Sequence, residues 1–166
     1  MSPLKPEECL HFFSEVLSIL HSTHEPERVL SLIVDRIVRM YGCQTCAVII
    51  INPETEYLQI STNHNLSHRY VKDFRRSLGT GAIAKTLSTG KPILIADGER
   101  EPELAGEIRL EYPFRSAVCL QISAELRTLG YLYADSRESH AFTQNDMRIL
   151  QSFADLISIA LNKSYL

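Results

Sequence analysis

The sequence has no excess of basic residues and no long apolar run. Its 166 residues include 17 Lys and Arg against 20 Asp and Glu, a net charge of −3. A nucleic-acid-binding domain usually presents a basic face, so this balance argues against a nucleic-acid partner. No apolar run approaches the roughly 20 residues that cross a bilayer, and the first residues lack the apolar core of a signal peptide. We therefore expect a cytoplasmic protein with no membrane partner.

Cysteines are few and scattered, at Cys9, Cys43, Cys46 and Cys119. This distribution favours reduced, buried thiols over a disulfide framework. Cys43 and Cys46 form a lone C-x-x-C, which could be a redox pair or half of a zinc site. No second pair exists, and no helix N-terminus follows to lower a thiol pKa. We interpret both cysteines as structural, although a redox role stays open.

Histidine pairs and catalytic motifs add little. Two histidine pairs have spacings that could bind a metal if each pair lay on a helix: His21 with His24, and His64 with His68. Neither pair has an acidic or cysteine partner nearby in the sequence. We interpret them as surface residues. No metal site and no catalytic residue is predicted, and no cofactor is indicated.

The length and the 45% apolar content suit one globular domain, because domains commonly contain about 100–200 residues. No internal repeat, low-complexity segment or Gly/Ser linker divides the chain. We predict a single domain over residues 1–166.

Helical spacing of apolar residues predicts two helices within residues 7–41. The first has apolar positions from Leu10 to Leu20, and the second begins near Pro26, with Ser22 or Thr23 as its cap. Gly42 is the expected terminator of the second helix.

Residues 45–135 read as a sheet with short insertions. Two hairpins are predicted from paired apolar runs joined by short polar turns. A further strand, a short helix between glycines and a charged segment lie between the hairpins. The predicted elements are the strands 45–51, 57–61, 92–97, 115–123 and 129–135, a helix over 81–87, a helix or turn around Leu66–Phe74, and a helical part of the charged segment around Leu104–Leu110.

A long terminal helix is predicted over residues 143–163. Thr143 suits its N-cap, and Asp146 stands where a capping box places an acidic or amide residue. The apolar residues from Met147 to Leu161 repeat at spacings of 3, 4, 3 and 4, as in a coiled-coil seam. Further apolar residues such as Phe153 widen this face, so we also expect packing on the sheet.

Four local motifs, in this order, resemble those of the GAF domain, a small-molecule sensor and dimerisation module of signalling proteins. They are Gly79-Thr80-Gly81 followed by Thr89-Gly90-Lys91-Pro92, the strand start Arg115-Ser116-Ala117-Val118, the strand Gly130-Tyr131-Leu132, and Phe142 with Asp146 and Leu150 at the start of the terminal helix. The resemblance covers nearly the whole chain.

The resemblance implies an α+β fold: a central antiparallel sheet, a layer of terminal helices on one face, and short helices and loops over a pocket on the other. On this model the candidate pocket residues are Thr80, Ile83, Asp97, Leu104, Tyr112, Arg115, Cys119, Tyr131 and Tyr133. The candidate dimer-interface residues are Leu10, Phe13, Leu17, Met147, Leu150, Ala154, Ile157 and Leu161.

Two of these roles stay open on the residues alone. Arg115 either binds a charged ligand or pairs with Asp97 or Glu111. Tyr131 and Tyr133 point to one face, either as pocket lining or as core under the helices.

The resemblance implies a regulatory homodimer that binds a small molecule of unknown identity and has no catalysis of its own. The output domain would be a kinase, a cyclase or a transcription regulator, separate or fused. One alternative is a structural dimerisation domain whose pocket is filled by its own side chains. Another, disfavoured because no cysteine lies between Gly79 and Val118, is a thiol enzyme like the free-methionine-sulfoxide reductases. The signatures of cyclic-nucleotide-binding and tetrapyrrole-binding members are also missing.

Overall fold

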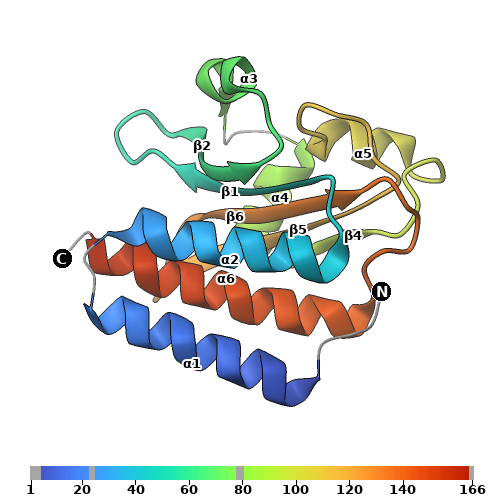
Figure 1. Cartoon of the computed structure of the whole chain (residues 1–166). Coiled ribbons are helices and arrows are strands. Elements are labelled where there is room, and N and C mark those ends of the chain that lie inside the picture. The colour runs from blue at the N-terminus through green and yellow to red at the C-terminus, as the bar shows by residue number, and fades with distance from the viewer. Residues whose placement is uncertain (1–4, 23–24, 78–80, 165–166) are drawn as a thin grey trace.

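The fold is α+β, and the computed structural model describes residues 5–22, 25–77 and 81–164. A central sheet separates two layers of helices (Figure 1). The elements in chain order are α1 (Pro6–Ser22), α2 (Pro26–Tyr41), β1 (Thr45–Ile51), β2 (Tyr57–His64), α3 (His68–Asp73), β3 (Arg76–Ser77), α4 (Gly81–Thr89), β4 (Ile93–Ile95), α5 (Pro102–Ile108), β5 (Ser116–Ala124), β6 (Arg127–Ser136) and α6 (Gln144–Ser164).

The six strands form one antiparallel sheet in the order β3-β2-β1-β6-β5-β4. Its centre is β6, which pairs with β1 on one side and with β5 on the other. β1 and β6 are nearly continuous apolar runs because both of their faces are covered. The predicted hairpins are therefore confirmed, and their strands from opposite ends of the chain meet in the middle.

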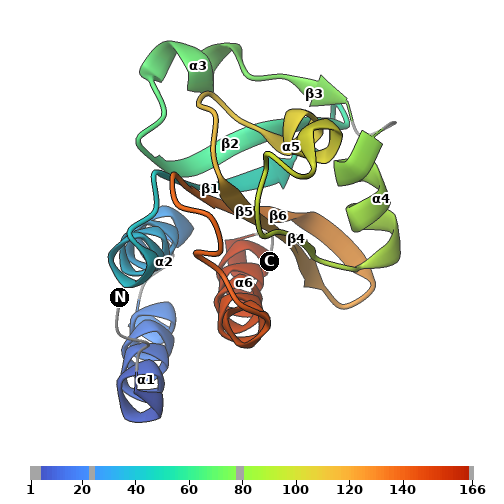
Figure 2. The same cartoon turned by 90° about the vertical axis from the view of Figure 1, so that its right-hand side faces the viewer.

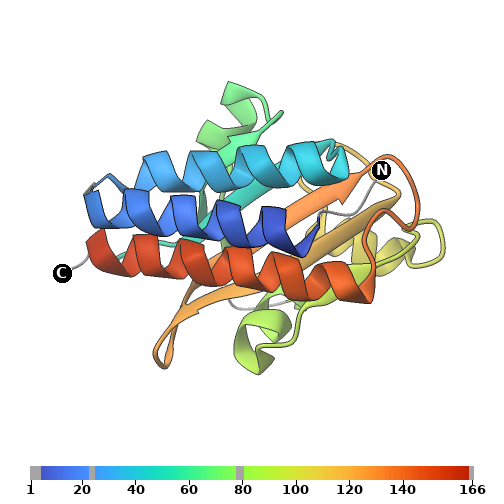
Figure 3. The same cartoon turned by 60° about the horizontal axis from the view of Figure 1, so that its bottom comes forward.

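The terminal helices cover one face of the sheet. α2 and α6 pack directly against the strands, whereas α1 lies outside them and contacts both (Figures 2 and 3). Their apolar side chains and one face of the central strands form a first core, which includes Val16 of α1, Ile33 of α2 and Phe153 of α6. No described helix combines the length and apolar character that a membrane span requires.

The apolar seam of α6 lies inside the chain. The side chains of Met147, Leu150, Ala154, Ile157 and Leu161 are all buried in the first core. The sheet and α2 cover this face of the helix, so the expectation that it meets a partner must be revised. Of the eight proposed interface residues, Leu10 and Leu17 of α1 are exposed and Phe13 is half-buried against Phe153.

The other face of the sheet carries α3, α4 and α5 (Figure 2). These short helices and the strands enclose a second core. It includes Ile49, Ile83, Ile108, Cys119 and Tyr131. The sheet thus has a buried layer on each side, as the sequence predicted.

Two helix ends follow local chemistry. Gly42 adopts φ 60°, in the left-handed region that glycine tolerates, and its N–H donates to Val38 at 2.8 Å, which ends α2. At the start of α6, Asp146 N–H donates to Thr143 Oγ1 at 3.2 Å, and Asp146 Oδ2 accepts from Thr143 N–H at 2.8 Å. This is the reciprocal capping box that the sequence predicted.

Some details differ from the prediction. β2 runs on to His64 because it pairs with β1 as far as Cys46, beyond the predicted end at Ser61. The two-residue β3 was not predicted; it exists because Arg76 and Ser77 pair with β2. α2 begins with Glu25 as its N-cap residue, without a side-chain cap, whereas Ser22 was expected in that role; Thr23 lies outside the described residues.

Candidate functional site

The second core brings together five of the predicted pocket residues. Ile83, Cys119, Tyr131 and Tyr133 are buried in it, and Leu104 packs against it. The two tyrosines alternate with Leu132 on β6, so they face the short helices while Leu132 faces the long ones. Thr80 lies outside the described residues.

The hydroxyl of Tyr131 is buried in the second core. Tyr131 is 0% exposed, and its oxygen has no hydrogen bond among the described residues. Leaving a buried hydroxyl unpaired costs on the order of 1–3 kcal/mol. Such a group marks a place where a further polar partner can be bound.

Arg76 and Tyr70 act electrostatically on Tyr131, and the sequence prediction missed both. The positive charge of Arg76 acts on Tyr131 and Cys119, and a hydrogen bond links it to the Tyr70 side chain. Arg76 also donates to the backbone oxygens of Glu107 and Arg109, which ties it to the chain around α5. Arg76 is found only once β3 is placed, because nothing around it in the sequence marks it as pocket-facing.

The predicted charged pair lies at the edge of the sheet. Arg115 Nε is 3.3 Å from Asp97 Oδ1, and its Nη1 is 3.7 Å from Glu99 Oε1. The hydrogen bond from Arg115 lowers the pKa of Asp97. The structure therefore pairs Arg115 with Asp97, one of the two open interpretations, and Tyr112 lies half-buried in the same loop region.

Three of the four thiols are poorly suited to nucleophilic chemistry. Burial raises the pKa of Cys43 to about 12 and raises the pKa of Cys46 and Cys119 strongly. A thiol reacts as its thiolate, so these groups stay protonated and inert near neutral pH. All four cysteines are free.

A buried carboxyl, Asp135, joins the second core to the end of the sheet. It accepts hydrogen bonds from the Tyr133 hydroxyl, from Gln44 Nε2 at 3.2 Å and from the backbone of Thr45. Burial raises its pKa from the usual 3.8 to about 6 despite these donors. The sequence places Asp135 at the end of an apolar strand, but it does not indicate which residues bond to its carboxyl group.

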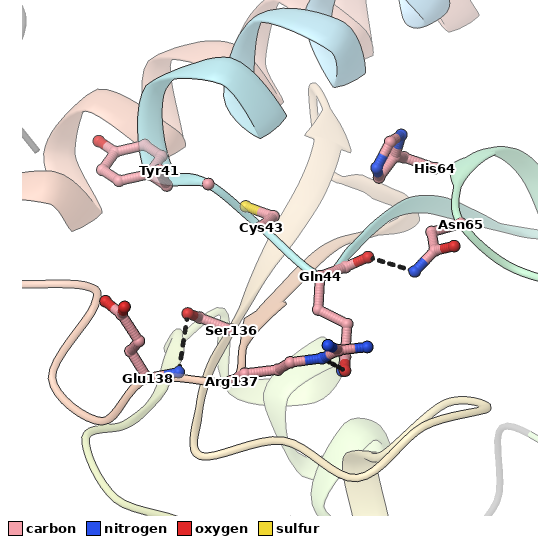
Figure 4. Close-up of a pocket in the computed structure, with 9 residues that line it drawn as sticks. Tyr41, Cys43, Gln44, His64, Asn65, Ser136, Arg137 and Glu138 are labelled. Atoms are coloured by element: carbon pink, nitrogen blue, oxygen red, sulfur yellow. Dashed lines mark hydrogen bonds between the residues drawn. The ribbon is translucent and has the colours of Figure 1, made fainter.

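Gln44 lines a cavity of about 620 Å³ at this end of the sheet and bonds to several of the residues around it (Figure 4). Its side-chain amide donates to Asp135 and to the Pro113 carbonyl at 3.0 Å, and its Oε1 accepts from Arg137 Nε at 2.8 Å. Its backbone oxygen accepts from Asn65 Nδ2 at 3.0 Å. We call this the Gln44 cavity; it is lined by Tyr41, Gly42, Cys43, Gln44, His64, Asn65, Ser136, Arg137 and Glu138.

Within the described ranges, no three His, Cys, Asp or Glu side chains group into a metal site. His21, His64 and His68 are exposed, and His24 lies outside those ranges.

The family model of the GAF domain matches residues 23–162. The chain therefore belongs to the GAF domain family, whose members are typically sensory or regulatory parts of signalling proteins. No curated relative matches the chain by sequence.

Solved structures of low sequence identity share the fold. The GAF domain of an Acinetobacter phosphoenolpyruvate-protein phosphotransferase aligns with a TM-score of 0.82 at 10% identity, over 98% of this chain and 96% of that one. The corresponding domain from Coxiella burnetii gives 0.77 at 20% identity, over 95% and 94%. A free methionine-R-sulfoxide reductase from Neisseria meningitidis, in complex with its substrate, gives 0.77 at 14% identity, over 99% and 96%. At these identities the likeness shows the fold alone.

Proposed function

We propose that this GAF domain is a regulatory module that binds a small molecule in the second core and has no catalysis of its own. The observation that carries the proposal is the buried hydroxyl of Tyr131, which has no hydrogen-bond partner among the residues that the structure describes. A ligand with a polar group would supply its missing hydrogen bond. Apolar surroundings with few directed polar groups are typical of small-molecule sites.

The arrangement around Tyr131 supports a regulated site. Arg76 is bonded to the backbone of Glu107 and Arg109, at the end of α5. A ligand that contacts Arg76 would therefore also act on α5, which lies over this face of the sheet. On the opposite face of β6, Leu132 packs in the first core with α6. β6 therefore contacts both layers, which offers a route from ligand to helices provided that the ligand favours one arrangement of them.

The absence of catalysis is proposed from the thiols. Sulfoxide reduction by cysteine needs an accessible thiolate, whereas Cys43, Cys46 and Cys119 are buried and have raised pKa values. Cys9 lies half-buried on α1, and partial burial raises the pKa of its thiol as well. We also propose that the domain acts in the cytoplasm as a homodimer. It would signal to a kinase, cyclase or transcription regulator, separate or fused.

The main competing function is structural dimerisation with a filled pocket, which the close packing of Ile83, Leu104 and Tyr131 favours. A thermal-shift screen of metabolites separates the two, because a ligand of the native state raises its melting temperature. We expect at least one stabilising compound for the native chain and a loss of its effect in Tyr131→Phe. This variant keeps the ring and removes the unpaired hydroxyl, so the free domain should be as stable as the native one or more stable by about 1 kcal/mol.

Ser123→Ala is a matched control, since Ser123 is an exposed hydroxyl residue on neighbouring β5. A broad screen without any stabilising compound would favour the structural role. A ligand that stabilises Tyr131→Phe as much as the native chain would separate ligand binding from this hydroxyl.

A further inference from the structure

The Gln44 cavity lies apart from the second core, and hydrogen bonds hold two parts of its wall. In its wall, Glu138 N–H donates to Ser136 Oγ at 3.1 Å, and the Glu138 carbonyl accepts from Ser116 Oγ at 2.6 Å. On the facing side, Gln44 is held by Asp135, which is 0% exposed. The side chain of Gln44 is thus anchored to a fully buried group.

Two opposite charges in this wall form no ion pair with any described residue. Arg137 uses only its Nε, in the bond to Gln44, and no described residue pairs with its terminal nitrogens. The carboxylate of Glu138 likewise has no hydrogen bond or ion pair among the described residues. Although Arg137 and Glu138 are adjacent in the chain, they do not pair with each other.

The two charges lie on different sides of the cavity (Figure 4). The guanidinium of Arg137 is beside Gln44, and His64 and Asn65 also line this side. Glu138 points toward the side of Tyr41, where α2 ends at Gly42. The C-terminal end of a helix carries a partial negative charge, so it adds to the carboxylate there.

We infer that the Gln44 cavity is a second small-molecule site, which takes a short zwitterion with a carboxylate at one end and an ammonium at the other. The free fork of Arg137 suits a carboxylate, which it can bind with two parallel hydrogen bonds. Glu138 and the end of α2 suit the ammonium. A volume of about 620 Å³ is ample for a molecule of amino-acid or dipeptide size.

The test uses glycine, diglycine and triglycine, which carry the same two charges at increasing separation. Each is titrated at constant ionic strength into the ¹⁵N-labelled protein, and backbone amide shifts are followed by NMR. Acetate and methylammonium serve as probes with one charge each. We expect saturable shifts at residues 42–44, 64–65 and 136–138 for one peptide length, and weaker binding of both single-charge probes.

Variants assign the two ends. Arg137→Gln and Glu138→Gln should each weaken the best zwitterion by about tenfold or more, because each removes one charge-assisted contact. Arg127→Gln is the matched control, since Arg127 is at the far end of the same strand, β6, and should leave binding unchanged. Glu138 is exposed, so its variant keeps the test valid even if Arg137→Gln disturbs the fold.

The proposal is overturned if no probe saturates, if the shifts fall outside these segments, or if both variants bind as the native protein does. Binding of acetate as tight as that of the zwitterions would also overturn it, since the acidic end would then contribute nothing. Tyr131→Phe should leave this binding intact, so failure here and failure of the site in the second core are distinguishable.

Discussion

Asp135 combines complete burial with a carboxyl group, and its hydrogen bonds link both candidate sites. Its pKa in the folded chain is about 6, above the usual 3.8. The folded state therefore binds a proton more tightly than the unfolded state does. Protonated Asp135 therefore adds to the free energy of unfolding. This added stability is complete below about pH 4 and is lost as the pH rises through 6.

We predict that Asp135→Asn removes this pH dependence. Between pH 4 and pH 7.5, the native chain should lose up to about 3 kcal/mol in its free energy of unfolding relative to the variant, because one pKa unit corresponds to about 1.4 kcal/mol. Urea unfolding at a series of pH values measures the difference. Asp155→Asn on the exposed face of α6 is the control for the same change of side chain outside the core. Parallel curves for the native chain and Asp135→Asn would refute the raised pKa.

The element whose boundary local chemistry defines best is α6. Thr143 and Asp146 bond each other reciprocally, and Asp146 Oδ1 also accepts from the Tyr41 hydroxyl at 3.2 Å. The cap thus joins the start of α6 to the end of α2. Its position at the entry of the helix follows from the residues themselves.

Thr143→Ala should lower the free energy of unfolding by about 1 kcal/mol, the usual cost of losing an N-cap side chain. Gln144→Ala, at an exposed position one residue later, should change it little. Denaturant unfolding of both variants gives the comparison. Equal stabilities would mean that the Thr143 side chain does not cap α6 in solution.

At the scale of the whole molecule, the open question is how two copies would meet. Most apolar residues of α6 are buried, whereas α1 lies on the outside of α2 and α6 (Figure 3). Leu10 and Leu17 are 69% and 41% exposed and are seven residues apart, so they share one side of α1. We propose this side of α1 as the contact between copies.

The double variant Leu10→Glu/Leu17→Glu is expected to convert a dimer into a folded monomer, because it places charges in an apolar contact. Light scattering after size exclusion gives the mass, and circular dichroism confirms the fold. Leu126→Glu, on the fully exposed β5–β6 turn, is the control. Persistence of the dimer in the double variant would remove α1 as the interface. Ile157→Glu would unfold the chain, since Ile157 is completely buried, and so reports nothing about the interface.

Most of the elements, and a few of their ends, could be predicted from the residues alone. Strand 45–51 was predicted at its observed bounds, because a short apolar run rich in β-branched residues strongly favours a buried strand. Gly42 and Thr143 marked helix ends through conformations and hydrogen bonds that involve only near neighbours. The family motifs then indicated the order of the layers.

Which side chains meet depends on the packing of segments that are distant in the sequence. Gln44 and Asp135 are 91 residues apart and bond because β1 and β6 are neighbours in the sheet. The same distant packing turned the regular seam of α6 toward the sheet, where its spacing alone had suggested a partner. A local pattern shows that a face is apolar, but what covers that face depends on contacts between distant segments.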